Sequence, residues 1–169
     1  NQNFHKFITD GIPVEYKIRG EIKHDTVWLF DFNNIKNNEF LAVNQFTIIE
    51  DKNNRRPDII LFVNGLPLVI IELKNPADEQ ATVMNAFKQI ELYKLEIPSI
   101  FRFNEIVIIS DGLETHAGTI TSGSERFSPW KTIDGKKPKQ LMTELEILVK
   151  GMLKQEILLD LIKNFIVFQ

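Results

Sequence analysis

The sequence contains no cysteine. Disulfide bonds, thiolate nucleophiles and cysteine-ligated zinc sites are therefore excluded, and the absence favours a reducing compartment. No run of about 18 uncharged apolar residues occurs, so we expect no membrane span. The start of the chain also lacks the charged region and apolar stretch of a secretory signal. These absences leave a disulfide-free globular domain that has no membrane partner.

An excess of positive charge is also missing, because 20 Lys and Arg face 23 Asp and Glu for a net charge of -3. Proteins that bind nucleic acid through their overall electrostatic field carry a basic surface. Any contact of this chain with DNA must therefore be local, bridged by a metal ion, or shared with other parts of a larger protein.

The 169 residues are 43% hydrophobic and include 13 Phe, which is typical of one packed domain with or without an appended helix. The chain starts at Asn1 and stops at Gln169, directly after an apolar helical stretch over residues 156–168. Apolar residues lie on several sides of that stretch, which favours either a helix docked on its own core or a fragment of a longer polypeptide. Both interpretations remain open.

Residues of high β propensity, separated by Gly, Asn and Asp, dominate the first half of the chain, and helical periodicity follows. The expected strands are residues 12–19, 26–32, 41–50, 58–63, 66–74, 103–110 and 115–121, and the expected helices are residues 79–95, 141–153 and 156–168. Residues 123–138 are expected to be irregular. This order predicts an α/β domain with a mixed sheet flanked by helices.

Three charged residues interrupt the two most apolar strands. Asp58 opens the first strand, and Glu72 and Lys74 close the second. Charged groups in strands that are apolar on both faces are costly unless they are paired or bound to metal. Glu72 and Lys74 are two residues apart and so share a face of the sheet. We therefore take this hairpin as the candidate site.

Whether Asp58 joins that face depends on the turn at Asn64-Gly65, which is a strong hairpin signal. A two-residue loop would set Asp58 opposite Ile71 and leave Glu72 on the other face. A three-residue loop makes Glu72 the diagonal neighbour of Asp58 or, shifted by one residue, its direct partner. The shared face therefore requires an odd-numbered connection or a β-bulge.

Two carboxylates at that separation can hold Mg²⁺, which prefers oxygen ligands and commonly binds one or two carboxylates together with a substrate phosphate. A lysine beside them can orient a water molecule or stabilise negative charge on a phosphate. The alternative is a structural ion pair among Asp58, Glu72 and Lys74 at the sheet edge. The spacing alone does not separate the two interpretations.

Pro57-Asp58 followed by Glu72-Leu73-Lys74 resembles the PD-(D/E)xK nuclease signature. Gln89 and Tyr93, four residues apart and so on one helix face, resemble the Q-x-x-x-Y element of its RecB-like branch. Further stretches resemble the N-terminal nuclease domain of type I restriction enzyme R subunits: residues 40–47, 55–76, 109–112, 125–130 and 159–168. The resemblance covers nearly the whole chain and implies a restriction-endonuclease-like fold.

The resemblance implies roles for the residues of the hairpin. Asp58 and Glu72 would bind Mg²⁺, for which Mn²⁺ could substitute, with the Leu73 backbone carbonyl as a third ligand. Lys74 would position the attacking water. Asp58, Glu72 and Lys74 would thus form the catalytic set.

Three residues outside the hairpin receive roles from the same resemblance. Gln89 and Tyr93 would contact the DNA backbone or support Lys74 and Glu72. His5 is the one candidate near the start for the metal-binding histidine that some members of this branch carry, although a lone surface histidine is the alternative.

The function implied is a Mg²⁺-dependent endonuclease domain that cuts double-stranded DNA without sequence specificity of its own, in the cytoplasm of a bacterium or archaeon. Modification and specificity subunits would be its partners. No G-x-x-x-x-G-K-[ST] motif occurs, so ATP would act only through a motor domain absent from this chain. Residues 1–135 would form the nuclease core and residues 136–169 a helical segment leading to the motor. The alternatives are a non-catalytic docking module of the same complex and a stand-alone RecB-like repair nuclease.

Overall fold

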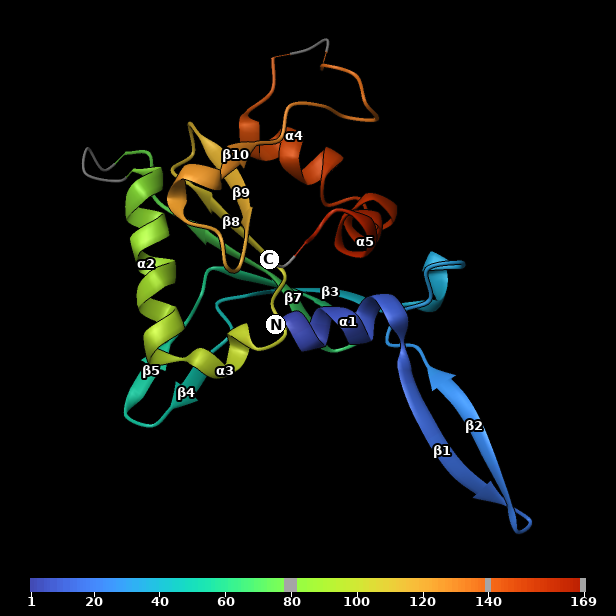
Figure 1. Cartoon of the computed structure of the whole chain (residues 1–169). Coiled ribbons are helices and arrows are strands. Elements are labelled where there is room, and N and C mark those ends of the chain that lie inside the picture. The colour runs from blue at the N-terminus through green and yellow to red at the C-terminus, as the bar shows by residue number, and fades with distance from the viewer. Residues whose placement is uncertain (78–81, 139–140, 168–169) are drawn as a thin grey trace.

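A computed structural model describes residues 1–77, 82–138 and 141–167 of the chain. Its centre is a six-stranded mixed sheet in the order β10-β9-β8-β7-β6-β3, in which only β7 and β8 run parallel (Figure 1). The strands are β3 (Phe40–Asn44), β6 (Ile59–Val63), β7 (Leu66–Leu73), β8 (Ile106–Ser110), β9 (Thr115–Thr119) and β10 (Ser128–Pro129). Helices flank this sheet, which confirms the predicted α/β class and is consistent with a restriction-endonuclease-like fold.

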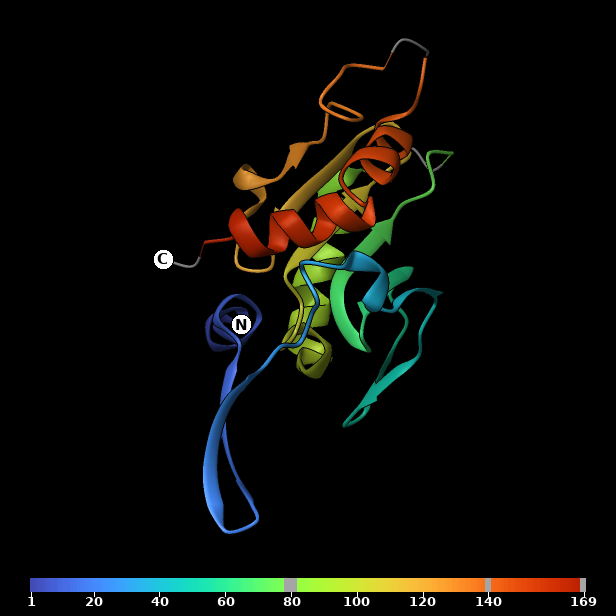
Figure 2. The same ribbon diagram turned by 90° about the vertical axis from the view of Figure 1, so that its right-hand side faces the viewer.

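Helices cover both faces of the sheet (Figure 2). One face carries α2 (Val83–Glu96) and α3 (Pro98–Phe101), and the other carries α1 (Gln2–Asp10), α4 (Glu144–Gly151) and α5 (Gln155–Asn164). Strand β7 is buried on both faces: Ile71 packs in the core beneath α4 and α5, and Ile70 packs in the core beneath α2. Because neighbouring residues of a strand point to opposite faces, Glu72 lies on the α2 side.

Two smaller hairpins and two short 3₁₀ turns complete the described part of the fold. Strands β1 (Ile12–Ile18) and β2 (Glu21–Val27) form a ribbon that projects from the domain, and β4 (Ile48–Glu50) pairs with β5 (Asn53–Arg55) close to α3 (Figures 1 and 2). The 3₁₀ turns are η1 (Ile35–Asn37) and η2 (Ser124–Arg126). No helix within the described ranges is long and apolar enough to cross a membrane.

The prediction of a strand over residues 26–32 is wrong, because the second strand of the ribbon is β2. After β2 the chain turns inward, and Phe30 is 2% exposed. Side chains, not a neighbouring strand, satisfy the backbone there: Asn64 Nδ2 donates to the Leu29 carbonyl, and Asn38 Oδ1 accepts from the Asp31 N–H. The side chains of Asn38 and Asn64 thus replace strand pairing here.

The predicted strand over residues 41–50 is broken into β3 and β4. The break is at Gln45, which has a left-handed backbone with φ 48° and whose N–H donates to the Asp58 carbonyl at 2.9 Å. Strand β3 therefore ends beside the first residue of the candidate site.

The helices were predicted with different success. Helix α2 matches the predicted helix over residues 79–95 from Val83 onward, and the part predicted for residues 79–81 lies outside the described residues. Helices α4 and α5 are shorter than predicted. Helix α4 begins late because the Thr143 hydroxyl accepts the Glu146 N–H and so caps its start. Helices α1 and α3 were not predicted. Leu148 of α4 and Leu159 of α5 pack in the same core as the sheet. The boundary between the nuclease core and the C-terminal helical segment, placed between residues 135 and 136, stays a prediction.

Candidate active site

A β-bulge sets the geometry of the candidate site. Asn64 and Gly65 form a two-residue turn, with φ values of 49° and 78°, and Val63 pairs with Leu66. Between the next pairs the register shifts: Phe62 faces Pro67 but Leu61 faces Val69, so Leu68 is the extra residue of a bulge in β7. The predicted need for a bulge is confirmed.

The bulge brings the two carboxylates to the same face. Ile59 pairs with Ile71, and the same register carried one residue further sets Asp58 opposite Glu72. Asp58 Oδ2 accepts the Leu73 N–H at 2.8 Å. The Leu68 carbonyl at the bulge accepts two hydrogen bonds at 3.0 Å, from the Glu105 N–H and the Asn104 side chain, so the irregular backbone is satisfied.

Glu72 is a buried carboxylate that is only partly neutralised. It is 4% exposed, and its Oε1 lies 3.0 Å from Lys74 Nζ. Its Oε2 is buried and has no hydrogen-bond donor among the described residues. Burial raises the pKa of Glu72, the Asp58 charge adds to the rise, and Lys74 opposes it. The fold therefore holds two repelling carboxylates close together, and the part of the chain that the structure describes gives Glu72 Oε2 no hydrogen-bond donor.

Lys74 follows the last residue of β7. Its N–H donates to the Ser110 carbonyl at the end of β8, at 2.7 Å, and its side chain is 25% exposed. The ammonium group is thus fixed at Glu72 and remains within reach of solvent.

Helix α2 places the two residues of the predicted Q-x-x-x-Y element over this face. Tyr93 is buried, and burial together with the negative charges of Glu72 and Asp58 raises its pKa to about 12. Its hydroxyl therefore stays protonated and available as a donor. Gln89 is half-buried one turn earlier on the helix.

Both ends of α2 are tied down by residues that the sequence did not single out for this role. At the start, Asp111 Oδ2 accepts the Val83 N–H at 3.1 Å. At the end, Arg55 donates twice to the Glu96 carboxylate, at 2.5 and 2.6 Å. Bidentate Arg–carboxylate pairs fix geometry as well as charge. Since Arg55 ends β5 three residues before Asp58, this pair joins the segment that leads to Asp58 to the helix that carries Tyr93.

The structure does not bring His5 to this cluster. His5 lies on α1, 9% exposed, with Nδ1 3.1 Å from Glu105 Oε2. Glu105 precedes β8, whereas the candidate site adjoins Ser110 at the other end of that strand. His5 is thus neither a lone surface histidine nor a neighbour of Asp58 and Glu72. Burial raises the pKa of Glu105 to about 8 and lowers the pKa of His5.

The metal-binding capacity of the described residues is limited. No group of three or more His, Asp or Glu side chains in these parts of the chain is placed to hold a metal ion. A metal at the candidate site would therefore have two carboxylates and main-chain carbonyls as protein ligands.

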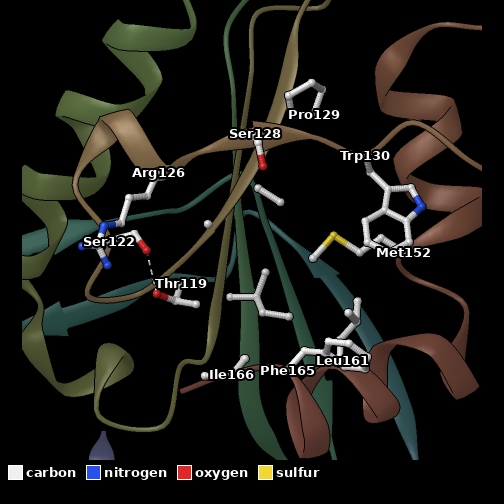
Figure 3. Close-up of a pocket in the computed structure, with 13 residues that line it drawn as sticks. Thr119, Ser122, Arg126, Ser128, Pro129, Trp130, Met152, Leu161, Phe165 and Ile166 are labelled. Atoms are coloured by element: carbon white, nitrogen blue, oxygen red, sulfur yellow. Dashed lines mark hydrogen bonds between the residues drawn. The ribbon is translucent and has the colours of Figure 1, made fainter. Parts of the chain in front are cut away.

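A separate cavity of about 320 Å³ lies between β9, β10 and α5 (Figure 3). Trp130, Met152 and Leu161 line one side, and the hydroxyls of Thr119 and Ser122 lie on the other. Met152 belongs to the core beneath α4 and α5, on the face opposite Glu72. The cavity is therefore not part of the carboxylate cluster.

Comparison with known proteins places the whole chain among restriction proteins. Residues 1–126 match the family model described as "Type I restriction enzyme R protein N terminus". The chain is 46% identical over 173 residues to the type I restriction enzyme HindI endonuclease subunit of Haemophilus influenzae, covering 100% of this chain and 16% of that protein.

Two further relatives show the same pattern. The putative type I restriction enzyme MjaIXP endonuclease subunit of Methanocaldococcus jannaschii is 34% identical over 184 residues. The match covers 97% of this chain and 18% of that protein. The type I restriction enzyme EcoprrI endonuclease subunit of Escherichia coli is 29% identical over 90% of this chain and 52% of its own length. The chain thus spans only part of the length of these relatives.

Proposed function

This chain belongs to the type I restriction enzyme R protein N-terminal family, and on that premise we propose that its Asp58–Glu72–Lys74 cluster hydrolyses phosphodiester bonds of double-stranded DNA with the help of Mg²⁺. The observation that carries the proposal is the buried Glu72 Oε2, which has no hydrogen-bond donor among the described residues although its carboxylate faces repulsion from Asp58. A bound cation would give Glu72 Oε2 a partner and would offset the repulsion between the two carboxylates.

The donor set fits a hard divalent cation. Asp58 and Glu72 offer carboxylate oxygens, and the Leu73 carbonyl is the third protein ligand we propose. Mg²⁺ commonly takes such a small protein set together with waters and a substrate phosphate, and Mn²⁺ accepts the same oxygen ligands. When bound, the ion would supply charge neutralisation at the phosphate and a more acidic water.

The remaining residues would act on the water and the phosphate. The Lys74 ammonium, 3.0 Å from Glu72 and reachable from solvent, would orient the attacking water and offset negative charge as it develops on the phosphate oxygens. Tyr93 keeps its proton because its pKa is raised to about 12, so it would serve as a neutral donor that supports Glu72 or a backbone phosphate. Gln89, half-buried on the same helix, would contact the DNA backbone.

Specificity and energy would come from elsewhere in the assembly. The chain covers 16% and 18% of the length of two of its relatives, and its sequence has no P-loop motif. We propose that a motor domain outside this chain uses ATP and that modification and specificity subunits select the DNA. A net charge of -3 fits a cutter that receives DNA from partners.

One observation favours a second candidate function. The Lys74–Glu72 contact is the ion pair expected of a non-catalytic docking module. The family match favours either role within an R subunit over a stand-alone repair nuclease.

Lys74→Ala in the assembled enzyme separates the two roles. We expect DNA cleavage to fall on the order of 10²–10³-fold, since a group that stabilises charge in the transition state is lost, while DNA-stimulated ATP hydrolysis is retained. Cleavage of plasmid DNA and ATP hydrolysis are measured on the same preparation.

The matched control is Lys150→Ala, which removes another Glu–Lys contact, to Glu146 on the surface of α4. It should leave cleavage unchanged. Wild-type cleavage by the Lys74 variant would instead support the docking module.

A further inference from the structure

The β1–β2 ribbon is the least covered part of the fold. Among the residues that the structure describes, its strands pair only with each other, and every residue of β2 is exposed. Figures 1 and 2 both show it standing away from the sheet. A two-stranded ribbon alone is marginally stable in water at best, yet Ile18 and Ile22 near its tip are 49% and 60% exposed. A ligand that encloses the tip would account for this.

Positive charge is concentrated in the distal half of the ribbon. Residues 17–23 contain Lys17, Arg19 and Lys23 against the single carboxylate of Glu21, whereas the chain as a whole has a net charge of -3. Lys23 lies 3.5 Å from Glu21 in an exposed pair, and such pairs hold little free energy. The distal half is therefore a local positive feature on an acidic protein.

The register places these charges on both sides of the ribbon. Lys17 pairs with Ile22 on one face, and Lys23 pairs with Tyr16 on the other. Arg19 lies in the turn, where it adopts a left-handed backbone with φ 52° beside Gly20. Basic side chains thus lie on both faces of the tip and at its end, and Glu21 shares the face of Lys23.

A flat protein surface would meet only one of these faces, whereas a groove of duplex DNA has phosphates along both walls. The major groove also admits a two-stranded β-ribbon. Of the other two carboxylates of the ribbon, Glu15 pairs with His24 at the midpoint and Asp25 pairs with Val14 one step nearer the domain. Asp25 accepts the Tyr16 hydroxyl at 3.4 Å. They would stay outside the groove.

We propose that the distal half of the β1–β2 ribbon is an arm that binds duplex DNA through its phosphates. The proposal rests on the proposed function only for the identity of the ligand, because it places binding away from the Asp58–Glu72 cluster. Contacts to phosphates carry no sequence information, so the arm would hold DNA of any sequence.

The test is binding of a short fluorescent DNA duplex to the full chain in EDTA, over a series of salt concentrations. Each phosphate contact contributes about 0.9 to the slope of log affinity against log salt. The triple variant Lys17→Gln, Arg19→Gln, Lys23→Gln should lower that slope by about 2–3 and weaken binding at least about tenfold at low salt.

The matched control makes the same charge change in the exposed loop before α4, with Lys131→Gln, Lys136→Gln and Lys137→Gln. It should bind nearly as the wild type does. An equal loss in both triple variants, or no binding by the wild type, would overturn the proposal. The proposal would also be overturned if the ribbon variant lost self-association or binding to a partner subunit while its DNA affinity stayed unchanged.

The outcome is separable from that of the cleavage test. A chain carrying Asp58→Ala and Glu72→Ala should keep the full salt-dependent binding in EDTA, because neither residue belongs to the ribbon. Loss of DNA binding in that variant would place the DNA contact at the cluster and overturn the arm.

Discussion

Glu72→Gln is expected to raise the melting temperature of the metal-free chain and to slow DNA cleavage by the assembled enzyme on the order of 10³-fold. The carboxylate is 4% exposed, and burial and the Asp58 charge raise its pKa. The folded state therefore holds the Glu72 proton more tightly than the unfolded chain, and folding stability falls as pH rises from the ordinary Glu pKa through the raised value. A neutral amide of the same shape removes that loss, so the melting temperature at neutral pH should rise by a few degrees.

Cleavage should respond in the opposite direction. Without the Glu72 carboxylate the proposed cation loses a ligand and Lys74 loses its partner, and we expect the cleavage rate to fall on the order of 10³-fold. The control is Glu91→Gln on α2, which removes a carboxylate that is 48% exposed and should change neither property. A lower melting temperature for Glu72→Gln would show that the Glu72–Lys74 ion pair is a net stabilising contact, as a structural role requires.

Glu105→Gln is expected to stabilise the chain at alkaline pH. Glu105 is fully buried, and burial raises its pKa to about 8. Stability of the wild type should therefore fall as pH rises from the unfolded Glu pKa towards that value, because the unfolded chain releases the proton first. Near pH 9 the variant should be more stable on the order of 5 kcal/mol, since the pKa of Glu105 is raised from the ordinary 4.5 to about 8 and each unit of pKa difference corresponds to about 1.4 kcal/mol.

The amide also suits the site. The glutamine amide can donate to His5 Nδ1 or accept from it, and this nitrogen lies 3.1 Å from Glu105 Oε2. Chemical denaturation across a pH series measures the difference, with Glu125→Gln as the exposed control. Near pH 5 the wild type and the Glu105 variant should be alike. A variant that is less stable at every pH would mean that the Glu105 charge itself stabilises the fold.

The site geometry could be predicted from sequence as far as local rules reach. Two apolar runs around Asn64-Gly65 predicted the hairpin, and the requirement that Asp58 and Glu72 share a face predicted an odd-numbered connection or a bulge. The position of the bulge at Leu68 was not predictable, because its carbonyl is satisfied by Asn104 and Glu105 from another segment.

The rest of the site depends on contacts between residues distant in sequence. Arg55 and Glu96 are 41 residues apart, and neither has a local pattern that marks the pair. The hydrogen bond from the Asn64 side chain to the Leu29 carbonyl also joins residues distant in sequence, 35 apart. It satisfies the backbone at Leu29, which lies in the expected strand over residues 26–32 but in no strand of the structure. His5 was considered for the metal site as the one histidine near the start, but its partner is the buried Glu105, which no periodicity in the sequence reveals.

The most direct measurement of the central claim is Mn²⁺ binding to the chain at neutral pH, followed by electron paramagnetic resonance. We expect one class of site in the wild type, a loss of that site in Asp58→Ala and in Glu72→Ala, and its retention in the surface variant Glu91→Gln. Equal Mn²⁺ binding by the wild type and both cluster variants, or no binding by any of them, would contradict a metal-dependent nuclease centre at Asp58 and Glu72.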